Sequence, residues 1–170
     1  MYNYYDDFLE KHIAQLIDMQ MREVSWKYDY DSKPNGTQKH WHVFCGHDMS
    51  ECYKNGYDFI EPIWSGIKNI DATLELERVY LNAHTFGIEP HIHRDDGDTT
   101  LIYYPRLDWK IEWGGGTSIY NDDVTEIDRH FINKGNRLIM FDAHLPHQAQ
   151  PVSRLCFQLR TCIVFKTNRV

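Results

Sequence analysis

The segment His93-Arg94-Asp95 places an imidazole and a carboxylate two residues apart. Together with a second histidine far downstream, these side chains can offer three ligands on one face of an octahedral metal ion. Two imidazoles and one carboxylate leave the remaining positions of that ion open, and this ligand set suits iron(II). A mononuclear iron site is therefore the first hypothesis for this chain.

A His-x-Asp triplet is weak evidence by itself. The chain has ten histidines, and with so many the triplet is expected about once by chance. The alternative interpretation is a turn histidine beside a solvated acidic loop, because Asp96 and Asp98 follow closely. The rest of the sequence must decide between the two interpretations.

Composition indicates a folded protein of one domain. The chain has 170 residues, of which 42% are hydrophobic and 25% charged, close to the averages of globular proteins. Acidic residues number 25 against 18 lysines and arginines, which gives a net charge of −7. This balance disfavours a nucleic-acid partner, because phosphate binding draws its affinity from a basic surface.

Membrane and secretory signals are not found in the sequence. No segment is apolar over the length that spans a bilayer, and residues 1–7 lack the basic start and apolar block of a signal peptide. The four cysteines have no paired spacing, so we interpret them as reduced thiols. We expect a cytoplasmic protein without membrane contact, and the sequence leaves the oligomeric state open.

Helices are expected only before residue 73. Apolar residues recur at helical spacing over residues 4–24, and a second helix is predicted over 57–68, with Pro62 in its first turns. Turn-forming residues predict a loop over 29–38.

After residue 73 the pattern changes to short β-rich segments separated by turn residues. The predicted strands are Leu74–Ala83, Thr99–Tyr104, Thr117–Tyr120, His130–Ile132, Arg137–Phe141 and Arg154–Lys166. The sequence thus predicts a single domain over 1–170, with a helical and loop support (1–73) and a β-sandwich or barrel core (74–170).

Several motifs follow the triplet in a fixed order. They are Thr99-Thr-Leu-Ile-Tyr-Tyr104, Trp109, Trp113-Gly-Gly-Gly-Thr117, Asn136-Arg-Leu-Ile-Met-Phe-Asp142, Pro146-His147-Gln-Ala-Gln-Pro151 and Leu159-Arg160-Thr-Cys-Ile-Val-Phe-Lys-Thr167. In this order and spacing, residues 78–167 resemble the iron(II)- and 2-oxoglutarate-dependent dioxygenases, specifically the prolyl-hydroxylase-like branch. The resemblance implies a mainly β fold with N-terminal helices, whose core is a double-stranded β-helix, or jelly roll.

The resemblance implies that His93, Asp95 and His147 hold iron(II). His93 and Asp95 would sit where one strand ends, and His147 at the start of a later strand. The residues that flank His147 favour it over His144, which we assign with His91 to the rim of the site. His91 remains an alternative ligand, because in a strand it points the same way as His93.

The resemblance also implies 2-oxoglutarate and dioxygen as cosubstrates, with ascorbate as a candidate stimulant. The distal carboxylate of 2-oxoglutarate needs a fixed cation, and a guanidinium pairs with it bidentately. Arg154 and Arg160 would face the same side of one strand, and Arg160 is preferred because the residues after it resemble the last strand of the family. Tyr104 should bind the same carboxylate, and Tyr80 and Asn82 are candidates for contacts near the keto acid.

The chain departs from the family pattern at two places that are not metal ligands. Gly116 completes a Gly-Gly-Gly where the family commonly has Gly-Gly-Glu, and Pro105 should end or kink the strand after the tyrosine pair. Asp95 is retained, whereas halogenating relatives lack this carboxylate. The implied reaction is hydroxylation of a C–H bond in a peptidyl residue, with proline as one candidate, or in a small molecule, with succinate and carbon dioxide as coproducts.

Three other functions compete with this hypothesis. A nucleic-acid demethylase of the same superfamily would carry two arginines on the last strand, at a spacing like that of Arg154 and Arg160. A non-enzymatic metal-binding jelly roll would form no succinate. A cupin-type enzyme without a keto acid would not need Arg160.

Other clusters favour structural interpretations. A zinc site is conceivable at His40, His42, Cys45, His47 and Cys52. Their spacing matches no zinc module, so a strand with its histidines on one face is favoured, lining the substrate entrance. The run Asp95–Asp98 lacks the pattern of an EF-hand, and the acidic residues Asp96, Asp98, Asp122 and Asp123 are predicted to steer a cationic substrate.

Overall fold

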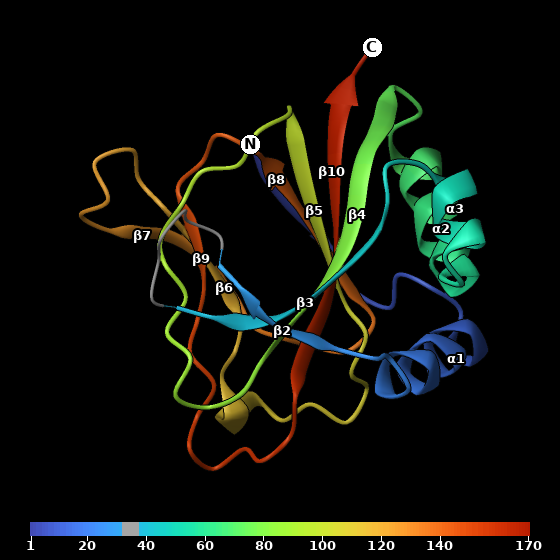
Figure 1. The fold of residues 1–170 in the computed structure, drawn as a ribbon. Helices are drawn as coiled ribbons and strands as arrows, with labels where there is room; N and C mark the ends of the chain where they lie inside the picture. The colour runs from blue at the N-terminus through green and yellow to red at the C-terminus, as the bar shows by residue number, and fades with distance from the viewer. Residues whose placement is uncertain (32–37) are drawn as a thin grey trace.

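A computed structural model describes residues 1–31 and 38–170 in two antiparallel sheets and three α-helices. The larger sheet has seven strands in the order β1-β8-β5-β10-β4-β3-β2, and the smaller has three in the order β7-β6-β9. The strands are β1 (Tyr2–Tyr5), β2 (Lys27–Tyr30), β3 (His40–Gly46), β4 (Leu74–His84), β5 (Thr99–Tyr104), β6 (Thr117–Tyr120), β7 (Ile127–Phe131), β8 (Arg137–Asp142), β9 (His147–Ala149) and β10 (Arg160–Arg169). The expected mainly β fold with a jelly-roll core is confirmed (Figure 1).

The two faces of β10 show why the chain folds in layers. Successive side chains of a strand point to opposite faces of a sheet. Ile163 and Phe165 therefore pack into the core under the helices, whereas Cys162 and Val164 pack into a second core that faces the smaller sheet. Figure 1 shows the helices on one side of the larger sheet and the smaller sheet on the other.

The helices cover the outer face of the larger sheet. They are α1 (Lys11–Arg22), α2 (Met49–Lys54) and α3 (Glu61–Ile70), and the short 3-10 helix η1 (Asp58–Ile60) precedes α3. Ile17 and Met21 of α1 and Ile63 and Ile67 of α3 are buried at helical spacing. The helix predicted over 57–68 is confirmed with Pro62 in the first turn of α3, whereas α2 was not predicted.

The prediction of one helix over 4–24 is wrong in its first part. Residues 2–5 form β1, which pairs with β8 and closes one edge of the larger sheet, and the helix begins only at Lys11. Tyr5 and Phe8 imitate a helical pattern because both pack against the helix-side core from a strand and a turn. The spacing of apolar residues did not distinguish these conformations.

The residues before 73 also contribute strands. The expectation of a helical and loop support is wrong in part, because β1, β2 and β3 all belong to the larger sheet; of these, only the strand with His40 and His42 was expected. The loop predicted over 29–38 is wrong at residues 29 and 30, which end β2, and residues 32–37 lie outside the described part of the chain. Strand β5 ends at Tyr104, directly before Pro105, as predicted.

Strand β10 begins six residues later than predicted. The segment around Arg154 is a turn, and the strand starts at Arg160.

Among the described residues, none of the helices has the length and apolar character of a membrane span.

Asp6 ties the end of β1 to β8 and generates a stability prediction. Arg137 donates from Nε to Oδ1 over 2.6 Å and from Nη2 to Oδ2 over 3.0 Å, and Lys134 adds a bond of 2.9 Å. The Arg137 hydrogen bonds are the main reason why the pKa of Asp6 is lowered to about 2. The folded state therefore gains stability from this carboxylate above pH 4 and loses it as the pH falls toward 2.

We predict that Asp6→Asn lowers the free energy of unfolding by about 1–2 kcal/mol at pH 7. Urea denaturation at pH 7, 5 and 3 measures the difference, which should shrink at pH 3 because the Asp6 carboxyl group of the unfolded chain is then mostly protonated, whereas that of the folded chain is still ionised. The exposed Asp123→Asn serves as the matched control. An equal loss for both variants would contradict the assignment.

Candidate active site

Two backbone hydrogen bonds bring His93 and His147 together. The His93 amide donates to the His147 carbonyl over 3.0 Å, and the His147 amide donates to the His93 carbonyl over 2.9 Å. Asp95 is fixed beside them because its amide donates to the carbonyl of Ala143 over 2.8 Å. The segment between β4 and β5 is thereby joined to the start of β9, and three side chains distant in sequence share one site.

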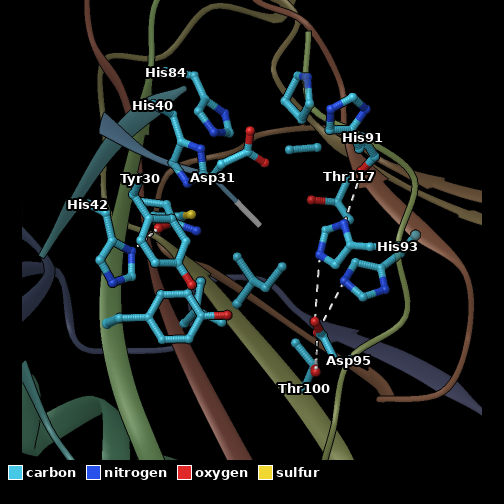
Figure 2. A pocket seen from close by; sticks show the side chains of 18 of the residues that line it. Tyr30, Asp31, His40, His42, His84, His91, His93, Asp95, Thr100 and Thr117 are labelled. Atoms are coloured by element: carbon cyan, nitrogen blue, oxygen red, sulfur yellow. Dashed lines mark hydrogen bonds and ion pairs between the residues drawn. The ribbon is translucent and has the colours of Figure 1, made fainter. Parts of the chain in front are cut away.

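The ligand atoms of His93, Asp95 and His147 converge. One ligand atom from each residue lies within 4.8 Å of the others, and this is the only such group of three or more metal-binding side chains among the described residues. His147 Nε2 lies 3.1 Å from Asp95 Oδ2, and His93 Nε2 lies 3.5 Å from Asp95 Oδ1. Figure 2 shows His93 and Asp95 directed toward one another at one end of the pocket.

Both histidines present Nε2 to the centre of this group. His93 Nδ1 donates to the carbonyl of His91 over 2.9 Å, and His147 Nδ1 donates to that of Leu145 over 2.9 Å. A carbonyl accepts only, so the proton is on Nδ1 and the Nε2 lone pair faces the site. Burial lowers the pKa of His147 to about 4, which keeps this imidazole in the neutral form that binds metals.

A buried lysine, which the sequence analysis did not single out, contacts the Asp95 carboxylate. Lys166 Nζ lies against Oδ2, and the Thr100 hydroxyl donates to the same oxygen over 2.7 Å. Lys166 Nζ also donates to Thr100 Oγ1 over 3.1 Å. Burial lowers the pKa of Lys166 and Arg78 adds to this, whereas the contact with Asp95 favours the ammonium.

Arg160 lies on β10 with its side chain fully enclosed. It is 1% exposed, and its Nε donates to the carbonyl of Gly115 over 2.7 Å. Nη1 lies 3.3 Å from the sulfur of Cys162, and Nη2 has no hydrogen-bond partner in the described part of the chain. A buried guanidinium nitrogen without a partner is unfavourable unless a ligand supplies an acceptor.

The glycine turn before β6 makes room for Arg160. Gly115 has a φ of +72°, and a Cβ there would lie 3.1 Å from Arg160 Cγ. At Gly116 a Cβ would collide with the backbone carbonyl of Phe131. The departure from Gly-Gly-Glu therefore has a steric cause in this chain.

Tyr104 lies beside Arg160 but does not line the cavity itself. The Arg160 guanidinium lies over its ring at 5.7 Å from the centroid, and its hydroxyl is 2.7 Å from Thr117 Oγ1. Thr117 does line the cavity. The sequence analysis missed Thr117, although it follows the three glycines directly and could have been found by its place at the start of the strand.

Tyr80 and Asn82 lie on the cavity wall formed by β3 and β4. Asn82 Oδ1 accepts a bond of 2.8 Å from His42 Nδ1, and the His42 ring stacks on Tyr30 at 3.8 Å between centroids. Tyr80 also packs against His42, with 5.1 Å between ring centroids, and burial raises the pKa of Tyr80. An aromatic wall thus faces the metal-binding group across the cavity (Figure 2).

The remaining candidates do not belong to the metal-binding group. Arg154 is exposed in a turn and does not line the cavity, so the expectation that it shares a strand face with Arg160 is wrong. His144 is exposed, and His91 lines the cavity without joining the metal-binding group.

The histidine and cysteine cluster of residues 40–52 does not converge. His40 and His42 lie on one face of β3 and line the cavity, as the favoured interpretation predicted. Burial raises the pKa of Cys45 and that of Cys52, the latter to about 11, so both remain protonated thiols. The acidic rim is largely engaged within the protein, since Asp96 pairs with Arg78 and Asp122 with Arg94.

These elements enclose one cavity of about 700 Å³, a size typical of ligand sites. Its lining runs from His93, Asp95 and His147 along the inner face of the larger sheet to Arg160. The arrangement places a metal-binding group and a buried cation in the same space, as a chelating ligand with a distant carboxylate requires.

Solved structures share this architecture. A prolyl 4-hydroxylase of Pseudomonas putida superposes with a TM-score of 0.69 at 13% identity, over 99% of this chain and 92% of that chain. An oxidoreductase of the 2OG-Fe(II) oxygenase family from Burkholderia pseudomallei gives 0.72 at 12% identity, over 99% and 85%. A prolyl hydroxylase of Trichoplax adhaerens, in complex with a peptide fragment of the hypoxia inducible factor oxygen degradation domain, gives 0.68 at 14%, over 99% and 83%.

The fold is that of the 2-oxoglutarate- and iron(II)-dependent oxygenases. Comparison with protein-family models gave no match, and neither did sequence comparison with curated proteins. The likeness to this oxygenase fold is therefore carried by the structure.

Metal titration tests the three ligands. We predict that the chain binds one Mn²⁺ ion and that His147→Ala or Asp95→Ala lowers the affinity by more than about 100-fold, because each removes a direct ligand. The EPR signal of free Mn²⁺ measures the affinity. The matched control is His91→Ala, which lines the same cavity, and a comparable loss there would make His91 a ligand instead.

Proposed function

We propose that the protein is an iron(II)- and 2-oxoglutarate-dependent oxygenase that hydroxylates a C–H bond of a peptidyl residue. The observation that carries the proposal is a single cavity that is lined both by His93, Asp95 and His147 and by the buried Arg160. The fold shared with prolyl hydroxylases supports this reaction class.

The donor set fits iron(II). Two neutral imidazoles and one carboxylate would occupy one face of the ion and leave positions for a bidentate keto acid and dioxygen. When bound, iron(II) and 2-oxoglutarate supply the oxidation: the keto acid yields succinate and carbon dioxide, and one oxygen atom enters the C–H bond. The backbone bridge between His93 and His147 fixes the imidazoles, while Thr100 and Lys166 fix one carboxylate oxygen of Asp95.

Arg160 would hold the far carboxylate of 2-oxoglutarate. Its Nε is already used by the Gly115 carbonyl, so the guanidinium is oriented before the ligand arrives, and Nη2 remains to donate. Tyr104 and Thr117 would support the same carboxylate through their linked hydroxyl groups. Burial of these groups excludes water and strengthens the ion pair.

The wall of Tyr30, His42 and Tyr80 would receive the substrate. It faces the metal-binding group and offers stacked ring faces rather than charges. Such a surface suits an aliphatic or saturated-ring side chain whose C–H bond must lie near the metal. A prolyl residue fits this description and is the first substrate to test, with a small molecule carrying the same group as the alternative.

The position of Arg154 disfavours the nucleic-acid demethylase hypothesis. That hypothesis required two arginines on the last strand, and Arg154 lies in a turn outside β10. The net charge of −7 also disfavours binding to phosphates.

Anaerobic titration with iron(II) and then 2-oxoglutarate tests the proposal directly. A metal-to-ligand charge-transfer band should appear for the native chain and be lost in His93→Ala. After admission of oxygen, succinate should form and increase with a prolyl peptide. Absence of both the band and succinate in the native chain would favour the non-enzymatic jelly roll.

The choice between the two arginines gives a separate prediction. Arg160→Ala should weaken 2-oxoglutarate binding to the Mn²⁺-loaded protein by about 100-fold, because it removes the buried cation and its charge-assisted hydrogen bond from Nη2. Isothermal titration calorimetry measures the dissociation constant. Arg154→Ala is the matched control, and the assignment is wrong if that variant loses affinity while Arg160→Ala keeps it.

A further inference from the structure

His84, the last residue of β4, is a buried histidine with an unsatisfied nitrogen. The residue is 4% exposed and lines the cavity, and its Nδ1 is fully enclosed without a hydrogen-bond partner among residues 1–31 and 38–170. Buried polar atoms are nearly always paired, so an unpaired one in a ligand cavity indicates a group that the ligand supplies.

The position of His84 on the sheet relates it to Arg160. The two residues are directly paired in the register of β4 and β10, where Cβ atoms of opposite side chains lie about 5 Å apart. Arg160 Nη2 is also enclosed, and none of the described residues offers it a hydrogen-bond acceptor. His84 and Arg160 thus occupy directly paired positions on neighbouring strands, and both residues line the same cavity.

His40 on β3 fixes the plane of the His84 ring. The two rings meet edge to face, with 4.9 Å between centroids and 80° between planes. Figure 2 shows this pair at the end of the pocket away from His93 and Asp95. The His84 ring is therefore held before a ligand enters, as a binding residue must be.

Burial lowers the pKa of His84 well below its ordinary value, and the charge of Arg160 acts in the same direction. The imidazole is thus neutral and carries one N–H. A neutral ring beside a guanidinium adds no second charge, but it can donate one hydrogen bond to an acceptor that the guanidinium already attracts.

We propose that His84 is a second binding residue for the far carboxylate of the keto-acid cosubstrate, donating from Nδ1 while Arg160 donates from Nη2. The proposal rests on the proposed function and adds to it a residue from β4. A carboxylate has two oxygens and several lone pairs, so one group can satisfy both nitrogens. A ligand without a carboxylate at this end would leave both unpaired.

The test compares two substitutions at one position. His84→Phe keeps an aromatic ring and removes the donor, whereas His84→Asn keeps an N–H close to the place of Nδ1. Calorimetry on the Mn²⁺-loaded protein measures binding of 2-oxoglutarate and of 2-oxobutyrate, which has the same chelating end but no far carboxylate. His144→Phe on the exposed rim is the control, and thermal melting confirms that each variant folds.

We expect His84→Phe to weaken 2-oxoglutarate binding by about 10- to 100-fold, because a hydrogen bond to a charged group is lost. Binding of 2-oxobutyrate should stay unchanged, and His84→Asn should recover most of the affinity for 2-oxoglutarate. Unchanged 2-oxoglutarate binding in His84→Phe would overturn the inference alone, as would an equal loss for both ligands. Failure of the native Mn²⁺-loaded chain to bind 2-oxoglutarate would instead overturn the proposed function, and the inference with it.

Discussion

The paired backbone hydrogen bonds between His93 and His147 are the constraint on which the site depends. They join the segment that follows β4 to the short strand β9, and so connect the larger sheet to the smaller one. As a consequence, the side chains of both histidines extend from directly paired backbone positions. A metal-binding group built on backbone bonds of this kind is rigid without the metal, which lowers the ordering cost of binding.

The interior also has to accommodate charges that would be unfavourable alone. Asp95 and Lys166 are buried in contact, so each compensates the other in a medium where an isolated charge is costly. Arg160 has no such carboxylate among the described residues and is oriented only by a backbone carbonyl and a sulfur. The difference separates a cation that is paired within the protein from one that, in the proposed function, binds the carboxylate of the cosubstrate.

The two faces of the larger sheet have different roles, since one packs against the helices and the other lines the cavity. The side chains of β10 that point outward bind the helices into one core, while those that point inward supply the cavity. Arg160 and Lys166 are six residues apart on that inner face, so one strand reaches both the distant end of the cavity and the carboxylate ligand. The β3 and β4 strands add the aromatic wall and His84, so the surfaces that we propose for substrate and cosubstrate lie on neighbouring strands.

The sequence alone predicted the type of fold, the positions of most core strands along the chain and the three side chains that converge in the structure, because strand periodicity and short motifs are local properties. It did not determine that residues 2–5 leave the helix to pair with β8, that Arg154 falls outside β10, that Thr117 and His84 line the cavity, or that Lys166 contacts Asp95. Those facts follow from pairing between segments far apart along the chain, and a strand's register decides which side chains point inward. A local sequence pattern indicates candidate residues, whereas only the tertiary structure decides which of them line the same cavity.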